Sequence, residues 1–132
     1  MKDVGGASTQ RILMTDRTAQ EGIALLLSQL PEVQVDVQLR LMPEQLWALI
    51  GSYSALIVCS ETQVTDELLA AATHLQVVGR AGSRLDNIDL EAAIWRGVLV
   101  VNAPRGNVIA AAEHTIALLL ALAPPTFFTV SL

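Results

Sequence analysis

A short loop of small and charged residues follows an apolar stretch near the middle of the chain, and its composition fits anion binding. The stretch Gln76–Gly79 is followed by Arg80, and Gly82 and Ser83 come two and three residues later. A glycine loop after a strand exposes backbone N–H groups, which together with an arginine can hold a carboxylate. Because short glycine loops are common, the spacing alone favours a simpler interpretation, in which Gly82 makes a turn and Arg80 is a solvated charge.

Polar residues follow other apolar stretches of the chain in the same way. In an open parallel sheet, ligands bind beyond the carboxyl ends of the strands, so residues at these ends form the candidate site. They are Asp16, Cys59-Ser60-Glu61, Arg80–Arg84 and Asn102–Asn107. In a parallel sheet these ends converge on one edge.

Short β-branched or aliphatic stretches alternate with helical patterns along the chain. The predicted strands are Arg11–Thr15, Val33–Gln38, Ala55–Val58, Gln76–Gly79 and Val98–Val101. This alternation predicts an α/β fold, a flavodoxin-like, doubly wound parallel sheet of about five strands with helices on both faces. A chain of 132 residues suits a single domain.

Capping and stop signals delimit the predicted helices. Ala19–Leu30 has apolar residues on one helix face, and Pro43–Ile50 begins with a proline in its first turn. The other two are 66–72, capped by Thr65, and 90–96, capped by Asp89 and ended by Gly97. Trp47 and Trp95 are predicted to pack against the sheet.

Composition and charge exclude several classes of function. The net charge of −5 and the isoelectric point of about 4.8 argue against a surface for nucleic acid or an anionic membrane, which needs clustered Lys and Arg. Met1–Gln10 has no basic segment followed by an apolar one, so no secretory signal is predicted. The single cysteine, Cys59, cannot form an intrachain disulfide, and a cytoplasmic protein is therefore expected.

A predicted helix over 107–123 is apolar on all sides. Glu113, His114 and Thr115 interrupt its apolar segment Val108–Ala123, which is shorter than the roughly 20 residues that a bilayer requires. We therefore expect protein, not lipid, to cover it. Because hydrophobic residues make up 52% of the chain, we predict that it associates with a partner through this helix, as a homodimer or otherwise.

Three motifs taken together resemble the D-isomer-specific 2-hydroxyacid dehydrogenase family. They are Gly79-Arg80-Ala81-Gly82, Asp86-Asn87-Ile88-Asp89 and Asn102-Ala103-Pro104, within a resemblance that covers Arg11–Ala123. The resemblance is to the substrate (catalytic) domain, most closely that of phosphoglycerate dehydrogenases, which transfer a hydride between NAD and a 2-hydroxy acid in serine biosynthesis. It implies a small 2-hydroxy or 2-oxo acid as partner, phosphorylated or not. It also implies that the substrate contacts Ser60, Arg80, Gly82, Ser83 and Asn102.

Two residues depart from the family pattern at this site. Cys59 stands where the family usually has an arginine that reaches a substrate anion, and Arg84 stands where it usually has a second glycine. Arg84 either blocks the loop or returns the charge that Cys59 removes.

The residues that hydride transfer requires are not predicted within this chain. It has no Gly-rich dinucleotide turn, so we expect the chain to bind no NAD and to show no turnover. His74 and His114 are assigned surface and packing roles, and Cys59 is a small strand-end residue, not a nucleophile. Asp86 fits a turn and Asp89 a helix cap, so no metal site is predicted.

The expected organisation is a flexible segment over 1–10, a substrate-binding domain over 11–123 and an aberrant tail over 124–132. The tail begins with Pro124-Pro125 and contains both phenylalanines. The leading interpretation is a substrate-binding domain that is inactive alone. The alternatives are a non-catalytic dimerisation or interaction module, and a truncated gene product without a selected role.

Overall fold

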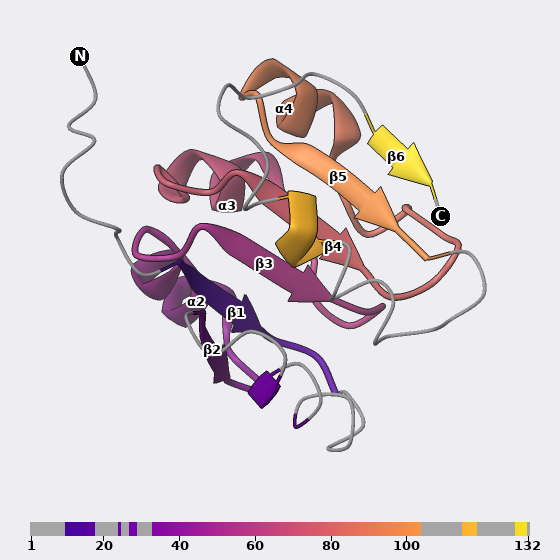
Figure 1. The fold of residues 1–132 in the computed structure, drawn as a ribbon. Coiled ribbons are helices and arrows are strands. Elements are labelled where there is room, and N and C mark those ends of the chain that lie inside the picture. The colour runs from indigo at the N-terminus through magenta and orange to yellow at the C-terminus, as the bar shows by residue number, and fades with distance from the viewer. Residues whose placement is uncertain are drawn as a thin grey trace, which may run out of the picture.

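The protein folds around a parallel six-stranded sheet (Figure 1). The computed structural model describes residues 10–17, 24, 27–28, 33–103, 115–118 and 129–131. The strands are β1 (Arg11–Met14), β2 (Gln34–Val37), β3 (Ala55–Val58), β4 (Val77–Arg80), β5 (Leu99–Asn102) and β6 (Thr129–Ser131). Their order is β2-β1-β3-β4-β5-β6, with every neighbouring pair parallel. The first five strands have the flavodoxin-like order, so the predicted fold class is confirmed.

Three of the helices that connect the strands begin at residues that the sequence marks as caps or first-turn positions. They are α2 (Pro43–Ile50), α3 (Asp66–Ala71) and α4 (Leu90–Trp95). The Thr65 and Asp89 side chains accept hydrogen bonds from the N–H groups of Leu68 and Ala92, which confirms both predicted N-caps. Gly97, with φ of 71°, follows the end of α4, as predicted.

Aliphatic side chains of the strands alternate between two hydrophobic clusters, one on each face of the sheet. One cluster packs against α2, α3 and α4 through Leu46, Ile50, Leu68, Leu69 and Ala93. The other contains Ile12, Met14, Ile57, Val101 and, from helical residues 115–118, Ile116. Every residue of β3, β4 and β5 is buried, which explains why these strands are nearly continuous apolar runs in the sequence.

Residues 115–118 are the described part of the predicted helix over 107–123. A side chain at Gly79 of β4 would collide with the hydroxyl of the fully buried Thr115, so the glycine permits this helix to approach the sheet. The rest of the predicted helix lies outside the described residues, and association through it stays a prediction. None of the described helices is long and apolar enough to cross a bilayer.

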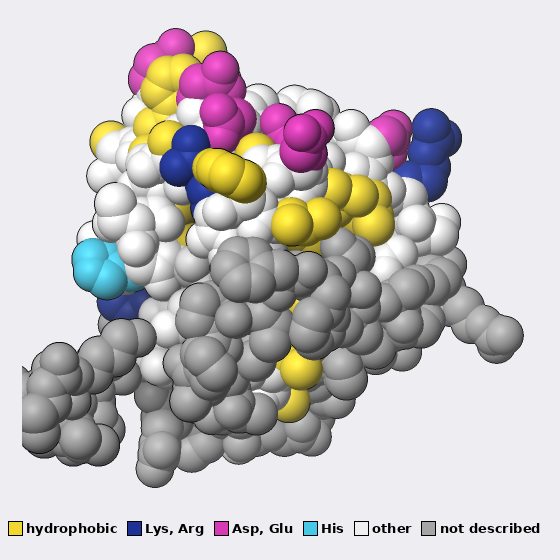
Figure 2. Space-filling view, turned by 90° about the horizontal axis from the view of Figure 1, so that it is seen from above, with side chains coloured by type: hydrophobic (Ala, Val, Ile, Leu, Met, Phe, Trp, Pro, Cys, Tyr) yellow, Lys and Arg dark blue, Asp and Glu magenta, His cyan; other side chains and the backbone are white. Residues whose placement is uncertain are grey.

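The structure differs from the sequence predictions at the C-terminal strand, at both tryptophans and by one residue at several strand ends. Thr129–Ser131 pairs with β5 as a sixth strand, within a segment that the sequence predicts only as a tail. The prediction that both tryptophans pack against the sheet is wrong, because Trp47 is 39% and Trp95 86% exposed. Figure 2 views the molecule from above relative to Figure 1, where α4 lies at the top, and shows hydrophobic side chains exposed among acidic ones.

The predicted helix 19–30 is described only at residues 24, 27 and 28, which are helical, and residues 1–9 are not described.

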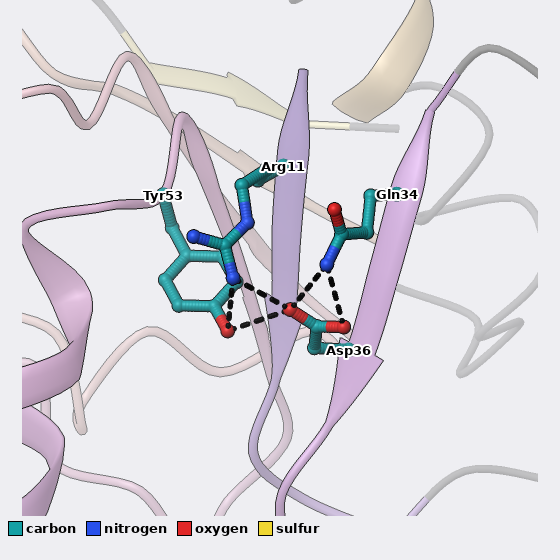
Figure 3. A network of polar contacts seen from close by, with 4 residues as sticks. All are labelled: Arg11, Gln34, Asp36 and Tyr53. Carbon is teal, nitrogen blue, oxygen red and sulfur yellow. Dashed lines mark hydrogen bonds and ion pairs between the residues drawn. The ribbon is translucent and has the colours of Figure 1, made fainter. Parts of the chain in front are cut away.

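A polar network joins β1, β2 and the residue Tyr53 just before β3 (Figure 3). Asp36 Oδ2 accepts hydrogen bonds from the Tyr53 hydroxyl at 2.7 Å and from Arg11 Nη2 at 3.1 Å, and Gln34 Nε2 donates to both Asp36 oxygens at 3.2 Å. The Arg11 guanidinium lies 4.5 Å from the centroid of the Tyr53 ring. The hydrogen bond from Tyr53 is the main cause that lowers the pKa of Asp36, and burial raises the pKa of Tyr53.

Candidate functional site

A small polar cleft lies beyond the carboxyl ends of β3 and β4. Its volume is about 280 Å³, and its lining residues are Ser60, Gln63, Arg80, Arg84, Asp86 and Asn87. Pockets for drug-sized ligands measure about 300–1,000 Å³, so this cleft suits a small molecule. It contains three of the residues that the sequence predicts at the site, namely Ser60, Arg80 and Arg84.

Arg80 is the buried cation of this cleft. Its exposure is 6%, so the alternative that it is a solvated surface charge is wrong. Arg80 Nε donates a hydrogen bond to Asn87 Oδ1 at 3.0 Å. None of the ion pairs among the described residues includes Arg80. Because a buried guanidinium without an anion is unfavourable, the two terminal nitrogens of Arg80 are suited to an anionic ligand.

The loop after β3 is held from both sides by buried polar side chains. Asp16, 4% exposed, accepts hydrogen bonds through Oδ2 from the N–H groups of Cys59 at 2.6 Å, Thr62 at 3.1 Å and Glu61 at 3.2 Å. Asn87 Nδ2 donates to the carbonyl oxygens of Cys59 at 2.7 Å and Thr62 at 2.8 Å. The N–H groups that Asp16 occupies are therefore not available to a ligand.

Asn87 is the residue of this site that sequence reasoning missed. It links Arg80 to the loop after β3, since its oxygen accepts from the guanidinium and its nitrogen donates to two loop carbonyls. Asp16 was predicted only as a strand-end residue, and the structure makes it the acceptor that orders the same loop. The available signal for Asn87 was its place in the motif Asp86-Asn87-Ile88-Asp89.

The loop after β4 is open by comparison. Gly82 has φ of 140°, a conformation that favours glycine, and a side chain there would displace the Arg80 guanidinium by contact with Nη1. No hydrogen bond within the described part of the chain uses the N–H groups of Gly82 and Ser83. Asn102, 4% exposed, donates from Nδ2 to the Ser83 carbonyl at 3.3 Å, while its Oδ1 is buried without a partner among these residues. The predicted residues 104–107 lie outside them.

Arg84 and Cys59, the two residues that depart from the family pattern, lie in different environments. The Arg84 side chain is 77% exposed and pairs with Asp86 at 3.3 Å on the rim of the cleft. The Cys59 thiol is half-buried, with Sγ 3.8 Å from the Arg17 carbonyl oxygen. Burial, followed by the charge of Asp16, raises the pKa of Cys59 against the opposing charge of Arg80, so the thiol is neutral near pH 7.

The remaining candidates lie away from the cleft or have structural partners. His74 Nδ1 is 2.8 Å from the carbonyl oxygen of Gly51, on the side of the sheet where β3 and β4 begin, and His114 is outside the described residues. Asp89 caps α4 and Asp86 pairs with Arg84. Among the described residues, no group of three or more His, Cys, Asp or Glu side chains could hold a metal ion.

A larger cleft of about 540 Å³ lies at the carboxyl end of β1, near the point where the strand order reverses. Ligands often bind at such a point in doubly wound sheets. Its lining is acidic, however, with one arginine, Arg40, and the four carboxylates Asp16, Glu44, Glu61 and Glu67. An anionic substrate is repelled by this lining, so the smaller cleft with Arg80 is the better candidate.

The structure is an α/β domain with a polar cleft, lined in part by the buried Arg80, at the edge of a flavodoxin-like sheet. Comparisons with known proteins assign its family. Residues 12–131 match the D-isomer specific 2-hydroxyacid dehydrogenase family, catalytic domain. The chain belongs to this family.

Individual relatives agree with that assignment. The chain is 41% identical over 113 residues to D-3-phosphoglycerate dehydrogenase of Synechocystis sp., a match that covers 86% of this chain and 20% of the relative. The TT0316 protein from Thermus thermophilus is 31% identical and has a similar structure, with a TM-score of 0.64 over 85% of this chain and 36% of that one. The 3-phosphoglycerate dehydrogenase of Entamoeba histolytica, solved with NAD⁺ bound, has the same fold at 22% identity, with a TM-score of 0.63 over 72% of this chain and 33% of that one. The chain thus spans about a fifth of the length of the curated relatives it matches.

Proposed function

We propose that this chain provides the substrate-binding domain, over residues 11–123, of an NAD-dependent D-2-hydroxyacid dehydrogenase similar to phosphoglycerate dehydrogenase. Such an enzyme transfers a hydride between NAD and a 2-hydroxy acid, and this cleft holds the acid group. The observation that supports the proposal is Arg80, a buried guanidinium that borders the cleft and has no carboxylate partner among the described residues.

The cleft offers a carboxylate several donors at once. Because Asn87 holds Arg80 Nε, the two terminal nitrogens of Arg80 can form a bidentate pair with the carboxylate. The hydroxyl of Ser60 in the lining adds a neutral donor, and we propose that the N–H groups of Gly82 and Ser83, in the adjoining loop after β4, add two more. Asn102 acts indirectly, by holding the Ser83 carbonyl and hence the loop.

NAD does not fit the described residues. A dinucleotide pyrophosphate binds the N–H groups of a Gly-rich turn between a strand and a helix. After β3 the N–H groups of Cys59, Glu61 and Thr62 already donate to Asp16, and after β4 the Arg80 side chain lies against Gly82. We propose that NAD binding, hydride transfer and proton transfer require residues outside those described.

The test is a titration of ¹⁵N-labelled chain with D-glycerate, followed by amide NMR. The amides of Gly82, Ser83 and Asn87 should shift and saturate, and NAD should leave them unchanged. Arg80→Gln should weaken D-glycerate binding about 10- to 100-fold, the usual value of a charge-assisted contact. Arg11→Gln is the matched control, because it removes a strand arginine far from the cleft. Scattered shifts, or wild-type affinity in Arg80→Gln, would refute the proposal.

A further inference from the structure

The two sides of the cleft contribute very different charges. On the β3 side the lining residues Ser60 and Gln63 are neutral, and the neighbouring Cys59 thiol is uncharged near pH 7. The β4 side carries all the formal charge of the described lining, as Arg80, Arg84 and Asp86. With two arginines and one aspartate, this lining has a net charge of +1.

This charge matches one carboxylate and no more. We infer that the cleft selects a 2-hydroxy acid with a single negative charge over the phosphorylated form of the same acid. The inference rests on the proposed function and specifies its substrate class. A phosphate group would add about 1.5 to 2 negative charges at pH 7 to a ligand whose carboxylate already occupies Arg80.

A phosphate has no unpaired cation to meet within the described lining. The second arginine, Arg84, is bound to Asp86 on the rim, where its charge is exposed and screened by solvent. A phosphate placed there must displace Asp86 from Arg84 and then lie beside that carboxylate. The phosphorylated ligand therefore encounters repulsion without a compensating contact.

D-Glycerate and 3-phospho-D-glycerate form a matched ligand pair, because they share a carbon skeleton and differ only in the phosphate. We expect the full chain to bind the phosphorylated acid about five- to tenfold more weakly at low salt, with the difference shrinking as salt screens the charges. Equal or tighter binding of 3-phospho-D-glycerate would overturn the inference. If neither acid shifts the amides of Gly82 and Ser83, the proposed function itself is wrong.

The variant Asp86→Asn tests whether the charge of the cleft lining causes this preference. Asp86→Asn raises the lining charge to +2 and frees Arg84 without changing side-chain size, so it should improve 3-phospho-D-glycerate binding about three- to fivefold more than D-glycerate binding. Glu91→Gln is the matched control, because it removes one negative charge from the exposed surface of α4, outside this cleft. If Glu91→Gln has the same effect, overall charge and not the lining sets the preference, and the inference fails.

Discussion

Two strand arginines lie near opposite ends of the same sheet and differ in how their charges are compensated. The Arg11 side chain, at the start of β1, is 36% exposed and donates to Asp36 at 3.1 Å and to the Tyr53 hydroxyl at 3.3 Å. Arg80, at the end of β4, is 6% exposed and donates to the neutral Asn87 amide. The more exposed arginine has the carboxylate, and the more buried one has none among the described residues.

This difference in charge compensation distinguishes the Arg11 network from the proposed binding site around Arg80. Each region leaves one buried polar atom without a partner among the described residues, Arg11 Nε and Asn102 Oδ1, so unpaired atoms alone do not distinguish them. The distinction is the uncompensated charge. Burying a guanidinium without an anion lowers stability, and a fold selected only for stability would place an apolar side chain there. The comparison therefore supports the proposal that the Arg80 region binds a ligand, whereas the Arg11 network contributes to stability.

The largest expected effect comes from the carboxylate that orders the cleft. Asp16→Ala leaves three backbone N–H groups near β3 without their acceptor, and each such loss costs about 1–3 kcal/mol. We expect the free energy of unfolding to fall by about 3 kcal/mol or more in urea denaturation. Asp36→Ala is the comparison, and it should lose less, about 1–2 kcal/mol, because Asp36 is itself part-exposed and only one of its partners, Tyr53, is buried. Equal losses would mean that the cleft is no more ordered than the Arg11 network.

A smaller effect is expected at two glycines that share a positive φ. Gly82→Ala forces a strained backbone and pushes against Arg80 Nη1, so it should lose about 1–2 kcal/mol of stability and most D-glycerate binding. Gly97→Ala, after α4, should lose about 1 kcal/mol and keep binding. The measurements are urea denaturation and the amide titration. Wild-type D-glycerate affinity in Gly82→Ala would show that Arg80 does not hold the acid group.

The central strands β3, β4 and β5 were predictable from the sequence because burial on both faces leaves a continuous apolar signal. Ala55–Val58 was predicted with its observed bounds, but the predicted strands Gln76–Gly79 and Val98–Val101 each end one residue early. The polar residues Arg80 and Asn102 still pair across β4 and β5, because backbone pairing does not depend on side-chain polarity. The two tryptophans were mispredicted since aromatic type, unlike position on the helix face, does not decide burial.

The candidate site could be proposed from the sequence only where its residues are close together. Arg80, Gly82 and Ser83 lie within four residues, but their spacing alone favoured a simple turn, and the family resemblance was needed to propose an anion-binding loop. The hydrogen bond from the Cys59 N–H group to Asp16 joins residues 43 positions apart, and no spacing rule anticipates it. The role of Asn87 could not be predicted for the same reason. Its Nδ2 donates hydrogen bonds to the carbonyl oxygens of Thr62 and Cys59, which lie 25 and 28 residues earlier in the sequence. These contacts exist only once parallel strands bring their carboxyl ends together.

The smallest expected effect is a pH dependence confined to the Arg11 network. The pKa of Asp36 is lowered in the folded protein, first by the Tyr53 hydroxyl, so ionised Asp36 stabilises the fold above the ordinary aspartate pKa of 3.8. This contribution is lost as the pH falls through the lowered pKa, where protonated Asp36 resembles asparagine. Asp36→Asn should therefore be less stable than wild type by about 0.5–1 kcal/mol at pH 7, and the difference between the two unfolding free energies should shrink as the pH falls below 3.8. A difference that does not shrink at all as the pH falls below 3.8 would mean that packing of the carboxyl group, and not its charge, holds β1 and β2 to Tyr53.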